Sequence, residues 1–289
     1  MAESPGPVGD AVQNAPSCYR HPDRETYVRC SRCERSICPD CMRAASVGFQ
    51  CPECVSEGAR TVRQGRTVFG GRISGDTSRV SLTIVALNVA VFVLGFAVGQ
   101  QELQLRFANL VGEPGLIGVA DGEYYRLLTA AFLHAGVLHL ALNMFALAQL
   151  GPVLESALGR VRFLALYVLA ALGGSVLSFL LSPQFQFGVG ASGAIFGLFG
   201  AYYVVVRRMG GETRSIVILL IVNLVITFTI PIIDWRAHLG GLVVGAVIAT
   251  AFAYAPRDER RTTWQAGACV AMALLLALAV VARTLALGA

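Results

Sequence analysis

Residues 190–206 read GASGAIFGLFGAYYVVV, an uncharged apolar run. Its third residue, Ser192, is a serine between small residues. Its length approaches the ~20 residues that an α-helix needs to cross a bilayer. Six further apolar runs lie along the chain, at 80–98, 136–155, 163–182, 215–233, 236–254 and 265–284. The sequence therefore predicts seven membrane-spanning helices.

The composition agrees with a membrane protein. Of the 289 residues, 55% are hydrophobic and 14% are charged, whereas soluble proteins carry about 25% charged residues. The mean hydropathy is +0.62. This apolar composition predicts the lipid bilayer as a partner. The net charge of +5 is small and spread over loops, so we expect no nucleic-acid partner.

Arginines indicate the orientation of the spans. They lie before the first span and in alternate loops, which places them on one side: Arg79, Arg160, Arg162, Arg207, Arg208, Arg214, Arg257, Arg260 and Arg261. Loops rich in Arg and Lys stay in the cytoplasm. We expect a multi-pass protein with a cytoplasmic N-terminus, and the compact array of six spans plus one favours a bacterial cell membrane. Arg106, Arg126 and Arg236 fall on the opposite side.

Three polar clusters interrupt the spans. They read HAGVLHLALN at 134–143, GASG at 190–193 and AHLGGLVVG at 237–245. Polar groups inside a membrane are costly, so each cluster is a candidate functional site. His139 and Asn143 are four residues apart and share a helix face. The predicted topology puts all three clusters at a similar depth near the outer surface.

The residue types in these clusters suit nucleophilic catalysis. A serine hydroxyl needs a base, and His is the usual base near neutral pH. Ser192 is the candidate nucleophile and His238 the candidate base. A helix beginning at Ser192 would direct its amide at a developing oxyanion, and the side chains of His139 and Asn143 could add donors.

Glycines would allow the helices to approach closely. Gly241 and Gly245 share a face with His238, and Gly193 lies beside Ser192. Small residues let membrane helices pack backbone to backbone. Gly190 and Gly193 also permit a tight turn into the helix at Ser192.

The order and spacing of these motifs resemble the signature of rhomboid intramembrane proteases. The resemblance covers roughly residues 78–255 and implies an all-α core of six helices over 80–255, with the seventh span added. It implies a Ser192–His238 dyad without a carboxylate or catalytic cofactor. It further implies an oxyanion site of the Ser192 amide, His139 and Asn143, with His134 in a structural role.

Two aromatic positions depart from the family pattern. Tyr124, Tyr125 and Arg126 resemble an aromatic-aromatic-Arg motif of the first external loop, with Tyr125 where the family usually has Trp. Phe196 stands where many members have Tyr beside the catalytic histidine. An aromatic ring is kept at both positions, so we expect the packing to persist.

The leading hypothesis is a serine endopeptidase that hydrolyses peptide bonds in or near transmembrane segments of membrane proteins. A second hypothesis is a non-catalytic rhomboid-like binder or adaptor that recruits partners through its N-terminal domain. Such pseudoproteases typically lose the serine or the histidine, and this chain keeps both. Seven spans alone also suggest a transporter or receptor, but no inverted repeat is evident.

The N-terminal region carries a separate metal-binding pattern over 17–56. Its eight candidate ligands form four pairs with two-residue spacers: Cys18, His21, Cys30, Cys33, Cys38, Cys41, Cys51 and Cys54. Eight ligands suffice for two tetrahedral zinc sites. Disulfides are disfavoured by the odd number of seven cysteines and by the reducing cytosol. We expect two structural Zn²⁺ ions.

This pattern resembles a B-box-type zinc finger. The resemblance implies an interleaved pairing in which the first and third pairs share one ion and the second and fourth share the other. A sequential pairing is the alternative. Such a domain would present a surface to a cytosolic protein partner.

The remaining segments are predicted to connect these parts. Residues 1–16 are expected to be disordered, and 57–79 to form an Arg-rich linker. Residues 100–126 are too long for a tight turn and suggest an interfacial loop. Residues 256–289 form a cytoplasmic loop and the seventh span.

Overall fold

The computed structural model describes residues 15–61, 65–73, 75–76, 78–112, 117–182 and 187–288. The expected disorder over 1–16 therefore lies almost wholly outside the described residues. The chain divides into two compact units, Met1–Gln64 and Gly65–Ala289.

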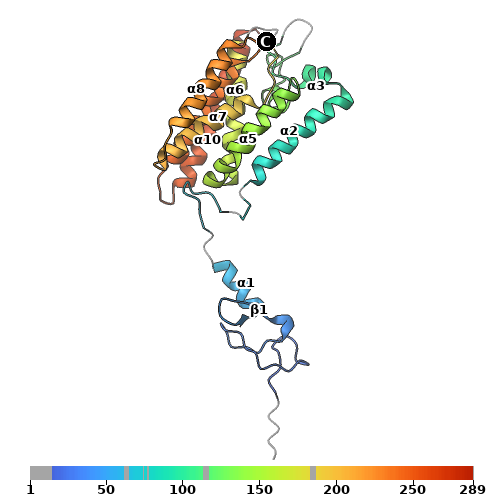
Figure 1. Ribbon diagram of the computed structural model, residues 1–289, viewed down its shortest axis with the longest axis vertical. Coiled ribbons are helices and arrows are strands. Elements are labelled where there is room, and N and C mark those ends of the chain that lie inside the picture. Colours follow the sequence, from blue (N-terminus) through green and yellow to red (C-terminus); the bar gives the residue numbers. More distant parts are fainter. Residues whose placement is uncertain are drawn as a thin grey trace, which may run out of the picture. The chain divides into compact units, whose positions relative to one another are not determined.

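The second unit is a bundle of long apolar helices (Figure 1). Among the described residues they are α2 (Arg79–Val98), α5 (Val137–Leu158), α6 (Arg160–Leu181), α7 (Ser192–Arg208), α8 (Arg214–Thr229), α9 (Trp235–Ala253) and α10 (Arg261–Ala286). Five of them, namely α2, α5, α6, α9 and α10, are long and apolar enough to cross a membrane, and α8 is a shorter apolar helix. The all-α polytopic fold is confirmed.

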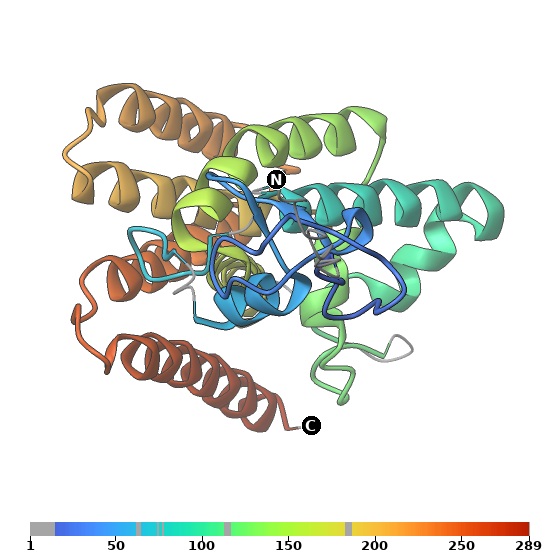
Figure 2. The ribbon, with the colours of Figure 1, turned by 90° about the horizontal axis from the view of Figure 1, so that it is seen from below.

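Helix α7 lies at the centre of this unit. Its residues from Gly193 to Ala201 are all buried, and it packs against α6 and α9. In contrast, α10 lies at the edge of the bundle in the view of Figure 2 and exposes large apolar side chains such as Leu274 and Leu278. Exposed apolar faces of this kind suit contact with lipid.

Glycines bring α7 and α9 into backbone contact. A Cβ atom at Gly241 would lie 1.8 Å from the carbonyl oxygen of Gly193, and one at Gly245 would lie 2.3 Å from that of Gly197. No side chain fits at such distances. Small residues on this shared face therefore determine how closely Ser192 and His238 can approach.

The helix boundaries differ from the predicted spans by up to four residues, and two of the shifts have a local cause. Helix α8 ends at Thr229 rather than at 233, because Pro231 disfavours helical geometry in the residue before it. Helix α7 begins at Ser192 rather than at 190, since Gly190 has a φ of +127°.

The arginine-bearing helix ends meet at one end of the unit. Arg160 donates to the carbonyl of Asp76, at 2.7 Å. Arg162 donates to the Gln265 side chain, also at 2.7 Å. Arg261 donates to the carbonyl of Val68. These contacts join the start of α2, the α5–α6 turn and the start of α10.

Part of the predicted linker packs onto this same end. Phe69 is only 1% exposed, and Gln265 of α10 donates to its carbonyl oxygen at 3.1 Å. The first residues of the predicted linker belong to helix α1 (Pro52–Thr61). The stretch 65–73 is therefore docked on the bundle.

The predicted interfacial loop contains two short helices, α3 (Gln100–Phe107) and α4 (Arg126–Thr129), with the 3₁₀ turn η2 (Ala130–Phe132) after them. Arg126 is buried and holds the loop together. It donates to the Glu123 carboxylate at 2.6 Å and to the carbonyls of Leu105 and Ala108 at 2.8 and 3.1 Å. The Tyr125 ring meets Phe107 edge-on.

The first unit has little regular structure. Before α1 it contains η1 (Pro39–Cys41) and the antiparallel pair β1 (Arg43–Ala44) and β2 (Phe49–Gln50). Its buried core consists of six cysteines and Ile37. A core this small cannot stabilise a fold by apolar burial alone.

Candidate active site and metal clusters

A cavity of about 730 Å³ opens beside the start of α7. Its polar lining includes the four candidate catalytic and oxyanion residues, which come from three helices: Ser192, His238, His139 and Asn143. Its other walls include aliphatic side chains of α5, α8 and the cap residue after α8: Leu138, Leu142, Ile226 and Ile230. Sequence clusters up to a hundred residues apart therefore meet at one apolar hollow.

Ser192 is the first residue of α7, directly after the cap residue Ala191. The first amides of a helix have no acceptor within the helix and carry its positive dipole end. In the described part of the chain no direct hydrogen bond joins Ser192 to His238. Catalytic contacts are often long before substrate binds.

His238 lies in the first turn of α9 and is 7% exposed. Its ring stacks on Phe196, with centroids 4.1 Å apart and planes 17° apart. Its Nδ1 lies 2.8 Å from the Thr227 hydroxyl of α8. Asp234 caps α9 by accepting from the amides of Arg236 and Ala237, which holds the turn that carries His238.

His139 presents its other nitrogen to the cavity. Its Nδ1 accepts a hydrogen bond from the amide of Ala135 at 3.3 Å, so a neutral ring carries its hydrogen on Nε2. A Cβ at Gly190 would lie 2.9 Å from this Nε2 and 3.5 Å from Ser192 Oγ. The N–H donor and the hydroxyl thus flank the bare backbone of Gly190.

Asn143 and His134 support the same region. Asn143 donates one amide hydrogen to the carbonyl of His139 at 2.8 Å, which leaves its second N–H for other acceptors. His134 is 2% exposed, and its ring meets His139 edge-on at 5.1 Å. Neither ring nitrogen of His134 has a partner among the described groups.

Two residues that support His238 were not singled out from the sequence. Thr227 resembles any threonine in an apolar helix, and nothing local indicates its contact with His238. Asp234 carried a signal, because an Asp directly before a helix is a favoured cap. It also accepts a hydrogen bond from Ser178 of α6.

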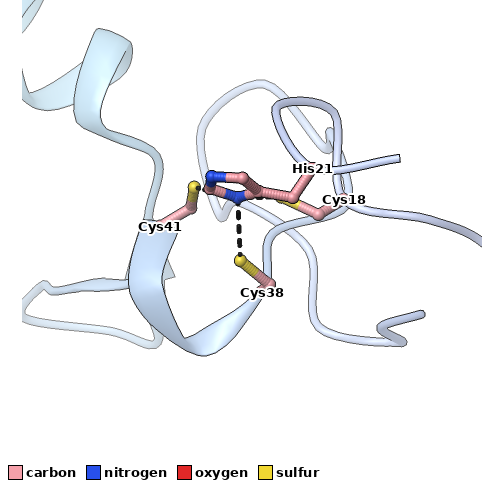
Figure 3. Close-up of side chains that lie close together, drawn as sticks. All are labelled: Cys18, His21, Cys38 and Cys41. Carbon is pink, nitrogen blue, oxygen red and sulfur yellow. Dashed lines mark hydrogen bonds between the residues drawn. The ribbon is translucent and has the colours of Figure 1, made fainter. Parts of the chain in front are cut away.

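The first candidate metal-binding cluster consists of Cys18, His21, Cys38 and Cys41, whose ligand atoms all lie within 4.8 Å of one another. Figure 3 shows the His21 ring among the three thiols. Its Nδ1 lies 3.3 Å from Cys38, 3.4 Å from Cys41 and 3.8 Å from Cys18.

The second cluster consists of Cys30, Cys33, Cys51 and Cys54. The structure thus groups the ligands in the interleaved way rather than sequentially, and all eight cysteines are free. Burial raises the pKa of the Cys30 thiol, but backbone hydrogen bonds, chiefly from Cys51, outweigh burial and lower it to about 6. Thiolates are the form that binds a metal.

Arg35 lies beside the second cluster. Its guanidinium donates to Cys33 Sγ at 3.3 Å and to Cys51 Sγ at 3.8 Å. It also pairs with Glu53 at 2.6 Å and lies over the Tyr19 ring. A positive charge so placed favours the thiolate form of the two sulfurs that it contacts.

These features define a multi-pass helical membrane protein with a serine and a histidine on one cavity and with two cysteine-rich clusters that could hold metal ions. The Rhomboid domain family model matches residues 121–255. Rhomboid protease GluP of Bacillus subtilis is 42% identical over 138 residues, which are 46% of this chain and 27% of GluP. YdcA of the same bacterium is 38% identical over 150 residues, or 50% of this chain and 74% of YdcA.

A eukaryotic relative extends the match. Rhomboid-like protease 3 of Toxoplasma gondii is 31% identical over 205 residues, which are 67% of this chain and 76% of that protein. The chain belongs to the rhomboid family. The family match and the relatives named as proteases support a serine protease at family level, and the N-terminal clusters fit a zinc finger.

Proposed function

We propose that this chain is an intramembrane serine endopeptidase that uses Ser192 as nucleophile and His238 as general base. The observation that carries the proposal is the convergence of Ser192, His238, His139 and Asn143 on one cavity inside an apolar bundle. Isolated polar groups in membrane helices rarely meet without a functional reason.

The reaction follows from the positions of these groups. His238 takes the proton of Ser192 as Oγ attacks the substrate carbonyl carbon. The oxyanion is stabilised by the Ser192 amide, Nε2–H of His139 and Nδ2–H of Asn143. The amine then leaves with the proton from His238. Water hydrolyses the acyl-enzyme with His238 again as base, and no metal or cofactor takes part.

The substrate is a peptide bond in or near a transmembrane segment. The aliphatic walls from α5 and α8 suit an apolar segment that enters from the bilayer. The arginine-bearing end of the bundle is the cytoplasmic one, so the N-terminal unit is cytoplasmic and the cavity faces the outer side. The membrane is that of a bacterial cell.

The N-terminal unit binds two structural zinc ions. With Zn–S and Zn–N bonds of about 2.3 and 2.0 Å, tetrahedral ligands lie about 3.5 Å apart for S and N and about 3.8 Å for two sulfurs. His21 Nδ1 lies 3.3 to 3.8 Å from three thiols. Cys33 and Cys51 are 3.8 Å apart. Exposed apolar residues, Tyr27 and Val47, offer a surface to a cytosolic partner.

A reporter with one transmembrane helix, reconstituted in vesicles with the purified protein, tests the proposal. We expect wild type to cleave it and Ser192→Ala and His238→Ala to remain folded without cleaving. Cleavage by Ser192→Ala at the wild-type rate would overturn the dyad. A folded wild type that binds membrane helices but cleaves none would instead favour the non-catalytic binder.

A further inference from the structure

The contact between α8 and α9 suggests a third residue that supports the dyad. We propose that Thr227 is a positioning residue that fixes the tautomer and the ring orientation of His238, and this inference rests on the proposed function. Thr227 itself does not touch the reacting atoms.

The contact between Thr227 and His238 is short and buried. Thr227 Oγ1 lies 2.8 Å from His238 Nδ1, and the Thr227 side chain is 3% exposed. Among the residues that the structure describes, this hydroxyl is the one hydrogen-bond partner of the His238 ring. Only Ile216 and Thr227 are buried on α8, so one of its two buried side chains lies against the candidate base.

The direction of the hydrogen bond follows from the number of hydrogens. The Thr227 hydroxyl has one hydrogen, and its oxygen also lies 2.7 Å from the carbonyl oxygen of Asn223. A carbonyl can only accept, and threonines in helices commonly donate to the carbonyl four residues earlier. The hydroxyl therefore accepts from His238, whose hydrogen lies on Nδ1.

This tautomer is the one that a general base requires. A neutral imidazole carries one hydrogen, so Nδ1–H leaves the lone pair on Nε2 free to accept the serine proton. The opposite tautomer would present an N–H to Ser192. In serine proteases with a triad, a carboxylate on Nδ1 performs this task. Here a neutral hydroxyl performs it.

The ring is also held on its face. Phe196 of α7 stacks on His238 with centroids 4.1 Å apart, which fixes the plane but leaves rotation within that plane free. The hydrogen bond to Thr227 selects which edge of the ring faces α8. The two contacts together orient Nε2.

Three variants test this inference. Thr227→Val keeps the shape but removes the hydroxyl, and Thr227→Ser keeps the hydroxyl. Thr229→Val is the matched control, since Thr229 also lies on α8 and donates to the carbonyl of Val225 but is exposed. Nitrogen NMR of the His238 ring reports the tautomer, and reporter cleavage gives kcat and KM.

We expect Thr227→Val to lose the single Nδ1–H tautomer and to lower kcat about tenfold or more with little change in KM. Thr227→Ser should restore both readouts, and Thr229→Val should match wild type. An unchanged tautomer and kcat in folded Thr227→Val would overturn the inference. If wild type itself does not cleave, the proposed function fails, while the NMR result still decides the role of Thr227.

Discussion

At the residue scale, the candidate site depends on one position that tolerates no side chain. Gly190 combines a φ of +127° with a virtual Cβ only 2.8 Å from the His139 ring. Any other residue would both strain the backbone and push the proposed oxyanion donor away from Ser192. Displacements of about 1 Å can lower a rate about 100-fold.

Gly190→Ala should therefore lower reporter cleavage about 100-fold or more. Gly210→Ala is the control, because Gly210 also has a positive φ, of +78°, but its virtual Cβ meets nothing within 4 Å. It should cost about 1–2 kcal/mol of stability and leave cleavage unchanged. Equal rates for Gly190→Ala and wild type would contradict the assigned geometry.

Asn143→Ala should lower kcat by about 10²- to 10³-fold, because a lost oxyanion donor has an effect of that size. Asn88→Ala is the control. Asn88 of α2 also donates to the carbonyl four residues earlier, at 2.8 Å, but does not line the cavity. A similar kcat loss in both variants would indicate general damage to the fold.

The sequence predicted the polar groups that line the cavity but not every contact that supports them. Ser192, His238, His139 and Asn143 stand out because polar residues interrupt apolar spans at them. Thr227 does not stand out, since its contact with His238 arises where α8 meets α9 and no local spacing encodes that meeting.

At the element scale, the contact between α7 and α9 carries the site. Gly241→Ala should destabilise the protein by at least about 3 kcal/mol, because its Cβ would overlap the carbonyl of Gly193 in a rigid helix. Thermal unfolding in detergent measures this. Gly267→Ala on α10 has nothing within 4 Å and should gain about 0.5–1 kcal/mol. Equal melting temperatures for Gly241→Ala and wild type would contradict this packing.

All seven predicted spans coincide with helices because each is a long apolar run. Their ends shifted by up to four residues, for example at the end of α8 before Pro231 and at the start of α10. The docking of Phe69 was missed. It is a single aromatic residue in a stretch of Gly and Arg, so local composition indicates a linker. Its burial depends on Gln265, almost two hundred residues later.

At the scale of the whole molecule, two units with different stabilising forces share one chain. Apolar helix packing holds the bundle, whereas we propose that the first unit depends on bound metal for folding. A strong chelator should release about two zinc ions per chain and unfold the first unit, with the helical signal of the bundle retained. Metal analysis and circular dichroism check this. If the first unit unfolded in the chelator without releasing zinc, its dependence on metal would be contradicted.

Arg35→Ala should weaken zinc binding at the second cluster by about 10- to 100-fold, since groups that contact metal ligands have effects of this size. Arg43→Ala is the control, because within the described residues the Arg43 side chain donates to the carbonyls of Asp40 and Met42 and to no thiol. Competition with a metal indicator measures both affinities. Equal zinc affinities of the two variants would show that Arg35 does not support metal binding at the second cluster.

The central claim is that Ser192 is a nucleophile activated by His238. We would label the purified protein in detergent with a fluorophosphonate and locate the adduct by mass spectrometry. We expect one adduct, on Ser192, that is absent from Ser192→Ala and strongly reduced in His238→Ala. A folded wild type without an adduct on Ser192, or with equal labelling in His238→Ala, would contradict it.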